Sequence, residues 1–324
     1  MTDAARLVFM GSPEFAVPSL RRLLEARYDI VAVYTQPDRQ AGRGRHLQPP
    51  PVKQAALEAG LPVFQPETLR RPEAVAELAS LHPDAIVVVA FGQVLRPPVL
   101  QIPGCGVLNV HASLLPRHRG ASPVAGALLA GDEAAGVSIM LLDAGLDTGP
   151  VLAQRAEAIL PEDTAGSLTD RLANLGAGLL VETLPAWLTG KLAPSAQDER
   201  QATLTRRVNK EDGRIDWSRP AREIWSRIRA YTPWPGAMTS LNGTPLQILQ
   251  AWPAAGGDDE PAGTVLPLAG AVDVPASLPP PAFAVQTGDG ILLPLVLKRA
   301  GKRALSAREF LNGERGLIGR RIGE

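Results

Sequence analysis

The stretch GVLNVHASLLPRHRG, residues 106–120, places an amide and an imidazole two positions apart at the end of an apolar run. Side chains two residues apart on a β-strand point to the same face, so Asn109 and His111 can aim together at one atom. The next apolar run, GVSIMLLD, continues into a Gly-rich turn with Asp143 and Asp147, from which a carboxylate can reach the imidazole. Each residue taken singly is typical of an ordinary cap, turn or core role, but the combination favours a reaction centre.

This set of side chains suits acyl transfer to an amine without a nucleophilic side chain. The amide and the imidazole can donate hydrogen bonds to a developing oxyanion. The carboxylate can fix the tautomer of the imidazole and help to move the proton that the amine loses. No Ser or Cys lies in a nucleophile-elbow motif, so a covalent intermediate is disfavoured. The four histidines are scattered and the only cysteine is Cys105, so we expect no metal site.

The composition is that of an ordinary globular protein and excludes several classes. The 324 residues include 33 basic and 33 acidic side chains, so attraction to a polyanion must be local. No run of 18 apolar residues predicts a transmembrane helix, and the first residues do not resemble a signal peptide. The turn GSPEF has Gly11 but lacks the other glycines of a dinucleotide fingerprint. We therefore expect a cytoplasmic protein with no membrane partner.

Apolar runs alternate with helical patterns through the first half of the chain. This alternation predicts an α/β fold with a Rossmann-like, mostly parallel sheet and helices on both faces. Ligands bind at the carboxyl ends of parallel strands, which is where Asn109 and His111 fall. Residues 164–189 are predicted as a helix that Pro185 bends or ends early. The catalytic domain is thus expected over residues 1–189.

The character of the chain changes in its second half. Residues 190–207 are polar and aperiodic, which predicts a linker. Over residues 208–324, a helix around PAREIWSRIRAY is followed by short apolar runs separated by Gly, Pro and Asp. This pattern predicts a second domain, a small β-barrel.

Two basic segments are candidates for binding an anionic partner. The long loop at residues 35–53 has Gly42 and Gly44 on either side of Arg43. Its length favours a clamp on an anionic or RNA partner, and the alternative is a solvated loop. Residues 298–321 contain eight basic and two acidic side chains, which favours a phosphate-contacting surface over a solvated helical tail.

The motifs NVHASLLPRHRGASP and GVSIMLLDAGLDTGPVL together resemble the signature of the folate-dependent formyltransferases. FMGSPEFAVPSL, VYTQPDRQAGRGR, DGRIDWSRPA and RAYTPWPGA resemble the branch of that family that acts on initiator methionyl-tRNA. The resemblance extends over essentially the whole chain. It implies that a formyl group passes from the cosubstrate 10-formyltetrahydrofolate to the amino group of initiator methionyl-tRNA, for translation initiation. It also implies that the C-terminal domain is an OB-like barrel that binds tRNA.

The resemblance also assigns roles to particular residues. It implies that the catalytic Asn, His and Asp are Asn109, His111 and Asp147. It implies a folate site lined by Ser113, Leu114, Leu115, Pro116 and Arg117. It places the tRNA-contacting loop at residues 36–52, and we assign tRNA contacts to Arg43, Arg45, Lys298, Arg299, Lys302 and Arg303.

Two other functions remain open at this point. Formyltransferases that act on a sugar-nucleotide or another small amine share the first two thirds of the pattern. The segment DGRIDWS and the barrel favour the tRNA substrate over these. A non-catalytic RNA-binding module, built from the loop and the barrel, is disfavoured by the intact set of Asn109, His111 and Asp147. We expect the protein to be a monomer.

Overall fold

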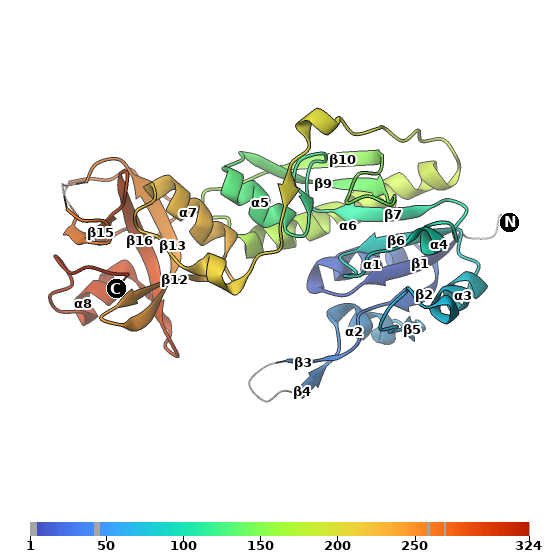
Figure 1. Cartoon of the computed structure of the whole chain (residues 1–324), viewed down its shortest axis with the longest axis horizontal. Coiled ribbons are helices and arrows are strands. Elements are labelled where there is room, and N and C mark those ends of the chain that lie inside the picture. Colours follow the sequence, from blue (N-terminus) through green and yellow to red (C-terminus); the bar gives the residue numbers. More distant parts are fainter. Residues whose placement is uncertain (1–4, 42–45, 258–259, 269, 324) are drawn as a thin grey trace. The chain divides into compact units, whose positions relative to one another are not determined.

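The computed structural model describes residues 5–41, 46–257, 260–268 and 270–323 (Figure 1). By its internal contacts the chain divides into two compact units. The N-terminal unit comprises Met1–Pro123, Ala134–Glu157 and Thr169–Thr205, and the C-terminal unit comprises Val124–Glu133, Ala158–Leu168 and Arg206–Glu324. Each unit has a sheet and a hydrophobic core of its own.

Seven described strands form the main sheet of the N-terminal unit, in the order β10–β9–β7–β6–β1–β2–β5. Strands β1, β2, β5, β6 and β7 pair in parallel, which confirms the predicted α/β class with a mostly parallel sheet. Strand β9 instead runs antiparallel to β7, with Ser138 opposite His111 and Leu141 opposite Leu108. The carboxyl ends of β7 and β9 therefore lie at opposite edges of the sheet. The strands are β1 (Arg6–Gly11), β2 (Asp29–Tyr34), β5 (Val63–Phe64), β6 (Ala85–Val89), β7 (Val107–His111), β9 (Ala134–Leu141) and β10 (Val151–Ala158).

Helices pack on both faces of this sheet, with α3 and α4 on one face and α6 on the other. On one face, Leu78 of α3 and Val99 of α4 pack with strand residues such as Ile86. On the other face α6 approaches closely, because a Cβ at Gly176 would lie 2.8 Å from Cγ1 of Val110. The helices and 3-10 turn along this part of the chain are η1 (Glu14–Ala16), α1 (Val17–Glu25), α2 (Pro51–Glu58), α3 (Pro72–Ser80), α4 (Pro97–Leu100), α5 (Pro123–Ala130) and α6 (Ala165–Leu188).

Three segments differ from the sequence-based expectations. Helix α6 continues to Leu188 through Pro185, which lies in its last turn and removes a single internal hydrogen bond. The basic loop contains a short antiparallel hairpin that extends from the sheet, β3 (Arg39–Ala41) and β4 (His46–Gln48) (Figure 1). The polar segment 190–207 contains the 3-10 turn η2 (Glu199–Gln201) and strand β11 (Leu204–Thr205), which pairs with β8 (Arg119–Gly120).

The C-terminal unit is built on a curled antiparallel sheet, which confirms the prediction of a small barrel-like domain. The strand order is β12–β13–β16–β15–β14, with β17 paired to β16. Residues 319–323 connect the two outer strands, because Gly319 N donates to Val265 O and Gly323 N donates to Ser240 O, each at 2.8 Å. The elements are η3 (Lys210–Gly213), α7 (Ala221–Ala230), β12 (Ala237–Leu241), β13 (Thr244–Ala254), β14 (Val265–Pro267), β15 (Phe283–Gln286), β16 (Ile291–Arg299), β17 (Ala304–Ser306) and α8 (Ala307–Gly313).

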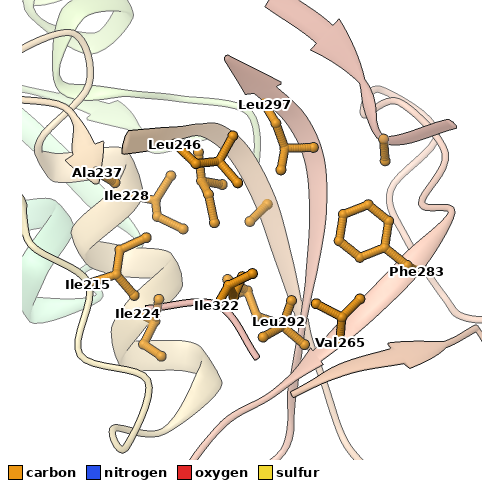
Figure 2. Packing of buried hydrophobic residues seen from close by; sticks show 14 of the residues in the cluster. Ile215, Ile224, Ile228, Ala237, Leu246, Val265, Phe283, Leu292, Leu297 and Ile322 are labelled. Atoms are coloured by element: carbon orange, nitrogen blue, oxygen red, sulfur yellow. The ribbon is translucent and has the colours of Figure 1, made fainter. Parts of the chain in front are cut away.

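The core of the C-terminal unit lies between this sheet and helix α7. Figure 2 shows Ile224 and Ile228 of α7 directed toward Leu246 and Leu292 of the sheet. Ile322, from the segment that connects the outer strands, is buried in the same cluster. The connecting segment is therefore held by apolar packing as well as by backbone hydrogen bonds.

The described part of the chain contains neither a membrane-spanning helix nor a cluster of metal-ligating side chains. None of the helices there is both long and apolar enough to cross a membrane. Nor do three or more His, Cys, Asp or Glu side chains within that part of the chain gather as they would around a metal ion.

Candidate active site

Asn109 and His111 lie on one face at the carboxyl end of β7. Val110, between them, faces α6, so alternation along the strand directs the other two side chains to the opposite face. Both residues are largely buried, with 9% and 6% of their surfaces exposed. Within the described residues no group hydrogen-bonds the Asn109 side-chain amide. That amide is therefore available to a ligand.

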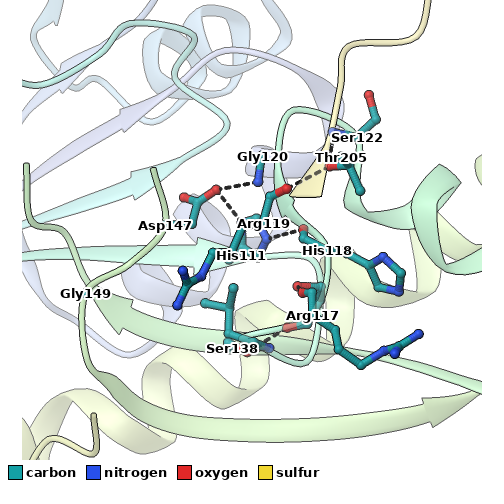
Figure 3. Close-up of polar contacts among 12 residues, drawn as sticks. His111, Arg117, His118, Arg119, Gly120, Ser122, Ser138, Asp147, Gly149 and Thr205 are labelled. Carbon is teal, nitrogen blue, oxygen red and sulfur yellow. Dashed lines mark hydrogen bonds and ion pairs between the residues drawn. The ribbon is translucent and has the colours of Figure 1, made fainter. Parts of the chain in front are cut away.

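The two ring nitrogens of His111 face different groups (Figure 3). Nε2 lies 3.1 Å from the carbonyl oxygen of His118, and Nδ1 lies 3.8 Å from Oδ2 of Asp147. A carbonyl oxygen only accepts hydrogen bonds, so Nε2 carries the ring proton. Burial lowers the pKa of His111 below 6.5, and the charge of Asp147 opposes that shift. The ring is therefore neutral at pH 7, with the lone pair of Nδ1 turned toward the carboxylate.

Asp147 reaches this position because the turn after β9 folds back. Its backbone has φ of +53°, and its Oδ2 accepts a 2.8 Å hydrogen bond from Gly120 N. The turn closes tightly at Gly149, where a Cβ would lie 1.9 Å from Leu141 O. Asp143 is used inside the turn, accepting from Gly145 N at 2.9 Å and from the Thr148 hydroxyl at 2.7 Å. Of the two candidate carboxylates, Asp147 is the one that faces the imidazole.

The segment 113–117, the expected folate site, is held by Ser138 of β9. The Ser138 hydroxyl donates to Ser113 O at 2.6 Å and accepts from Leu115 N at 3.0 Å. Gln154 of β10 donates to Leu115 O at 2.8 Å and to the Ser138 hydroxyl at 2.9 Å. Ser113 and Leu115 are buried, Leu114 and Pro116 are half-buried, and Arg117 is exposed; the Leu115–Pro116 peptide bond is cis.

A second segment, residues 197–205, lies against residues 116–122; we call it the strap. Arg119, although 4% exposed, forms a two-bonded ion pair with Glu199 at 2.6 and 2.9 Å. Thr205 donates its hydroxyl to Arg119 O at 3.0 Å. At Gly120, where φ is +106°, a Cβ would lie 2.4 Å from Thr205 O, so a side chain does not fit. The strap therefore fixes the backbone that presents Gly120 N to Asp147.

The base of the β3–β4 hairpin is anchored beside the carboxyl ends of β2 and β5. Lys53 donates to both carboxylate oxygens of Asp38, at 2.9 and 2.8 Å, and to Gln65 at 2.8 Å. The hydrogen bonds from Lys53 and Gln65 hold the pKa of Asp38 below its usual value. Arg43 and Arg45 lie outside the described residues.

The basic residues predicted on the C-terminal unit fall into two pairs. Arg299 is ion-paired with Glu314 and its guanidinium lies 5.5 Å from the centre of the Phe310 ring. Arg303 is ion-paired with Glu309 at 2.9 Å. Lys298 and Lys302 are exposed, and neither has a carboxylate partner within the part of the chain that the structure describes.

A mostly parallel sheet carries this polar cluster at the carboxyl end of β7, and a barrel-like unit follows it along the chain. Residues 5–184 match the family model described as formyl transferase, and residues 207–315 match the model described as formyl transferase, C-terminal domain. The chain belongs to the formyl transferase family.

The relatives agree with this assignment over nearly the whole chain. The methionyl-tRNA formyltransferase of Roseiflexus sp. (strain RS-1) is 50% identical, over 98% of this chain and 95% of that protein. The methionyl-tRNA formyltransferase of Roseiflexus castenholzii is also 50% identical, over 98% of this chain and 99% of that protein. An N-formyltransferase from Helicobacter canadensis, solved with folinic acid and dTDP-3-aminofucose, has a similar fold. It has a TM-score of 0.64 and 20% identity and covers 90% of this chain and 98% of that chain.

The sequence-based candidates did not include the residues that hold the site together. Ser138 and Gln154 occupy ordinary strand positions, and their hydrogen bonds cross from one strand to a distant turn. The strap lies between the two family-model matches, in a segment without hydrophobic periodicity. The one local sequence signal of these contacts was Gly120, the glycine directly after Arg119 at the end of the stretch GVLNVHASLLPRHRG.

Proposed function

We propose that this protein transfers the formyl group of 10-formyltetrahydrofolate to the amino group of initiator methionyl-tRNA. The observation that supports it best is that the Asp147 carboxylate faces the buried imidazole of His111. The side-chain amide of Asn109 lies beside them on the same face of β7, in a chain that belongs to the formyl transferase family. The curated relatives at 50% identity carry the same activity in their names.

In this reaction the amine nitrogen attacks the formyl carbon, and the bond from that carbon to N10 of the folate then breaks. The carbonyl oxygen becomes an oxyanion in between. We assign the Asn109 amide as its donor, because the amide has hydrogen-bonding capacity left and points to the same face as His111. The sequence alone suggested that His111 also donates to this oxyanion. Its Nε2 proton, however, is directed at His118 O, 3.1 Å away.

His111 and Asp147 are better arranged to manage the proton that the amine loses. Neutral His111 presents the lone pair of Nδ1, so this nitrogen can accept the proton. The imidazolium that results faces the Asp147 carboxylate at 3.8 Å, which stabilises the new charge. The proton then returns to N10 as tetrahydrofolate leaves, so the enzyme ends the cycle in its starting state.

The remaining assignments extend from this centre. We propose that residues 113–117 line the folate, held in place by Ser138. We assign tRNA contacts to Arg43 and Arg45 of the hairpin loop and to Lys298, Arg299, Lys302 and Arg303 of the C-terminal unit. We also expect a monomeric, cytoplasmic enzyme.

A turnover assay tests the function directly. Purified protein is given 10-formyltetrahydrofolate with initiator methionyl-tRNA, with elongator methionyl-tRNA, or with an amino-sugar nucleotide, and the formylated product is quantified. We expect fast formylation of the initiator tRNA and slow or no formylation of the others. Formylation of the amino-sugar nucleotide alone would assign the protein to the small-amine branch. Tight tRNA binding without any product would assign it to the non-catalytic class.

A further inference from the structure

Gln197 is a residue of the strap whose side-chain amide has a hydrogen-bond partner for every donor and acceptor. Its Nε2 donates to Asp147 O at 2.8 Å and to Gly149 O at 2.6 Å. Its Oε1 accepts from Nε and Nη2 of Arg119, at 3.1 and 2.9 Å. A glutamine amide has two N–H donors and one carbonyl oxygen with two lone pairs, so every capacity of the group is taken.

These bonds hold the backbone of the Asp147 turn, whereas the Asp147 carboxylate is held by a separate bond. Asp147 adopts a φ of +53°, a left-handed conformation that is uncommon for residues other than glycine, and Asp adopts it more readily than most. Gly120 N fixes its carboxylate at 2.8 Å, and Gln197 fixes its carbonyl. Arg119 connects the two anchors, because it directly precedes Gly120 and binds Gln197. The strap, the Gly120 turn and the Asp147 turn therefore form one closed hydrogen-bonded circuit.

We propose that Gln197 is a positioning residue for formyl transfer, which holds the Asp147 carboxylate toward His111 through the backbone of the Asp147 turn. The inference rests on the proposed function, because it assigns Gln197 a part in that same reaction. It adds to the reaction centre a residue from the segment between the two family-model matches.

The test compares Gln197→Met with Gln197→Glu. Met has a similar length but neither donor nor acceptor, so the two carbonyls of the Asp147 turn lose their protein partner. Glu keeps the acceptor for Arg119 but turns a carboxylate oxygen toward those carbonyls, so the turn is repelled. A displacement of about 1 Å at a reacting group costs about 10²-fold in rate. We expect kcat to fall about 10- to 100-fold in both variants, with the larger fall in Gln197→Glu. KM for both substrates should stay within about twofold, because neither substrate is touched.

Gln201→Met is the matched control. Gln201 belongs to the same strap and is exposed, and among the described residues its side chain donates only to Asp198, at 3.0 Å, so this variant should keep the wild-type kcat. Circular dichroism and thermal unfolding establish that each variant is folded at the assay temperature.

Three results would overturn the inference. The first is a folded Gln197→Met with kcat within twofold of wild type. The second is an equal loss of kcat in Gln201→Met. The third is a rise in the KM for tRNA with kcat unchanged, since that would make the strap a tRNA contact. Wild-type protein that formylates no tRNA would instead overturn the proposed function, and the two failures are therefore distinct.

Discussion

Replacing Asp147 by Asn removes one charge from the site and keeps most of its shape. The amide oxygen of Asn can still accept the hydrogen bond that Gly120 N donates to Asp147, at 2.8 Å. What disappears is the negative charge 3.8 Å from Nδ1 of His111. The proposed mechanism places a positive charge on that ring when the amine loses its proton, so the variant isolates the electrostatic contribution of Asp147.

The distance sets the size of the effect. Two unit charges about 4 Å apart interact by about 4 kcal/mol at an effective dielectric constant of about 20. Screening by water is weak here, because the side chains of His111 and Asp147 are only 7% and 14% exposed. At about 1.4 kcal/mol for each factor of ten, full loss corresponds to about 10³-fold in rate. The amide dipole of Asn recovers part of this, so we expect kcat to fall about 10²- to 10³-fold.

The assay is kcat for formylation of initiator methionyl-tRNA at saturating folate and tRNA, with a single-turnover measurement to show that the chemical step, and not product release, is what slows. Asp143→Asn is the control, since Asp143 is exposed in the same turn and, within the described ranges, its carboxylate accepts hydrogen bonds only from Gly145 and Thr148. It should retain kcat within about threefold. A fall of less than about fivefold in Asp147→Asn would refute the proposed proton pathway.

The pH dependence of kcat provides an independent test of the role of His111 as a base. His111 acts as a base only when neutral, and its pKa lies below 6.5 because the ring is buried. The acid limb of the wild-type profile should therefore lie below pH 6.5. Asp147 raises the pKa of His111 and the neighbouring His118 lowers it, so Asp147→Asn should move the limb to still lower pH. Movement to higher pH would contradict this assignment.

Three further predictions test the parts around the reaction centre. Gly120→Ala puts a Cβ 2.4 Å from Thr205 O and should lower kcat about 100-fold. Its control is Gly60→Ala, which is also at positive φ but has no atom within 4 Å of the added Cβ. The control should lose only about 1 kcal/mol of stability, measured by thermal unfolding. Ser138→Ala leaves buried Leu115 N and Ser113 O without their partner and should raise the KM for the folate while the KM for tRNA stays constant; the reverse pattern would disprove the folate assignment. Lys298→Ala with Lys302→Ala should raise the KM for tRNA and reduce by about 2 the slope of log affinity against log salt, and an unchanged slope would mean that these lysines do not meet phosphates.

Much of the site's location could be predicted from strand geometry. Alternation along β7 places Asn109 and His111 on one face, and the strand is apolar and bounded clearly enough for its end to be located. The sequence also predicted that a carboxylate after the next strand reaches His111, but the structure brings Asp147 there by a different route. A parallel β9 would bring its carboxyl end to the edge where β7 ends, but β9 is antiparallel. The turn that follows β9 instead folds back, with glycine at its tightest point, to bring Asp147 to His111.

The structure of the strap could not be predicted from pattern, for a physical reason. Periodicity reports elements that bury one apolar face, and residues 197–205 bury almost none. Their order comes from the backbone pairing of β11 with β8 and from side-chain amides, hydroxyls and a carboxylate that bond residues roughly 50 to 86 positions away in sequence. Each such bond is specific in space and leaves no local repeat. The same holds for residues 319–323, whose backbone connects the outer strands of the barrel-like sheet.

We propose that the strap, which lies between the two family-model matches, supports the reaction centre through Gln197 and Glu199. Arg119 is the decisive case, because a guanidinium with 4% of its surface exposed needs partners for its donors and charge. Glu199 and Gln197 supply them, and both come from the strap. Without these partners Arg119 would have to turn outward to water, which would pull on Gly120 and release the Asp147 carboxylate. We therefore propose that the catalytic unit extends to Thr205, where the N-terminal compact unit ends, and not only to residue 189.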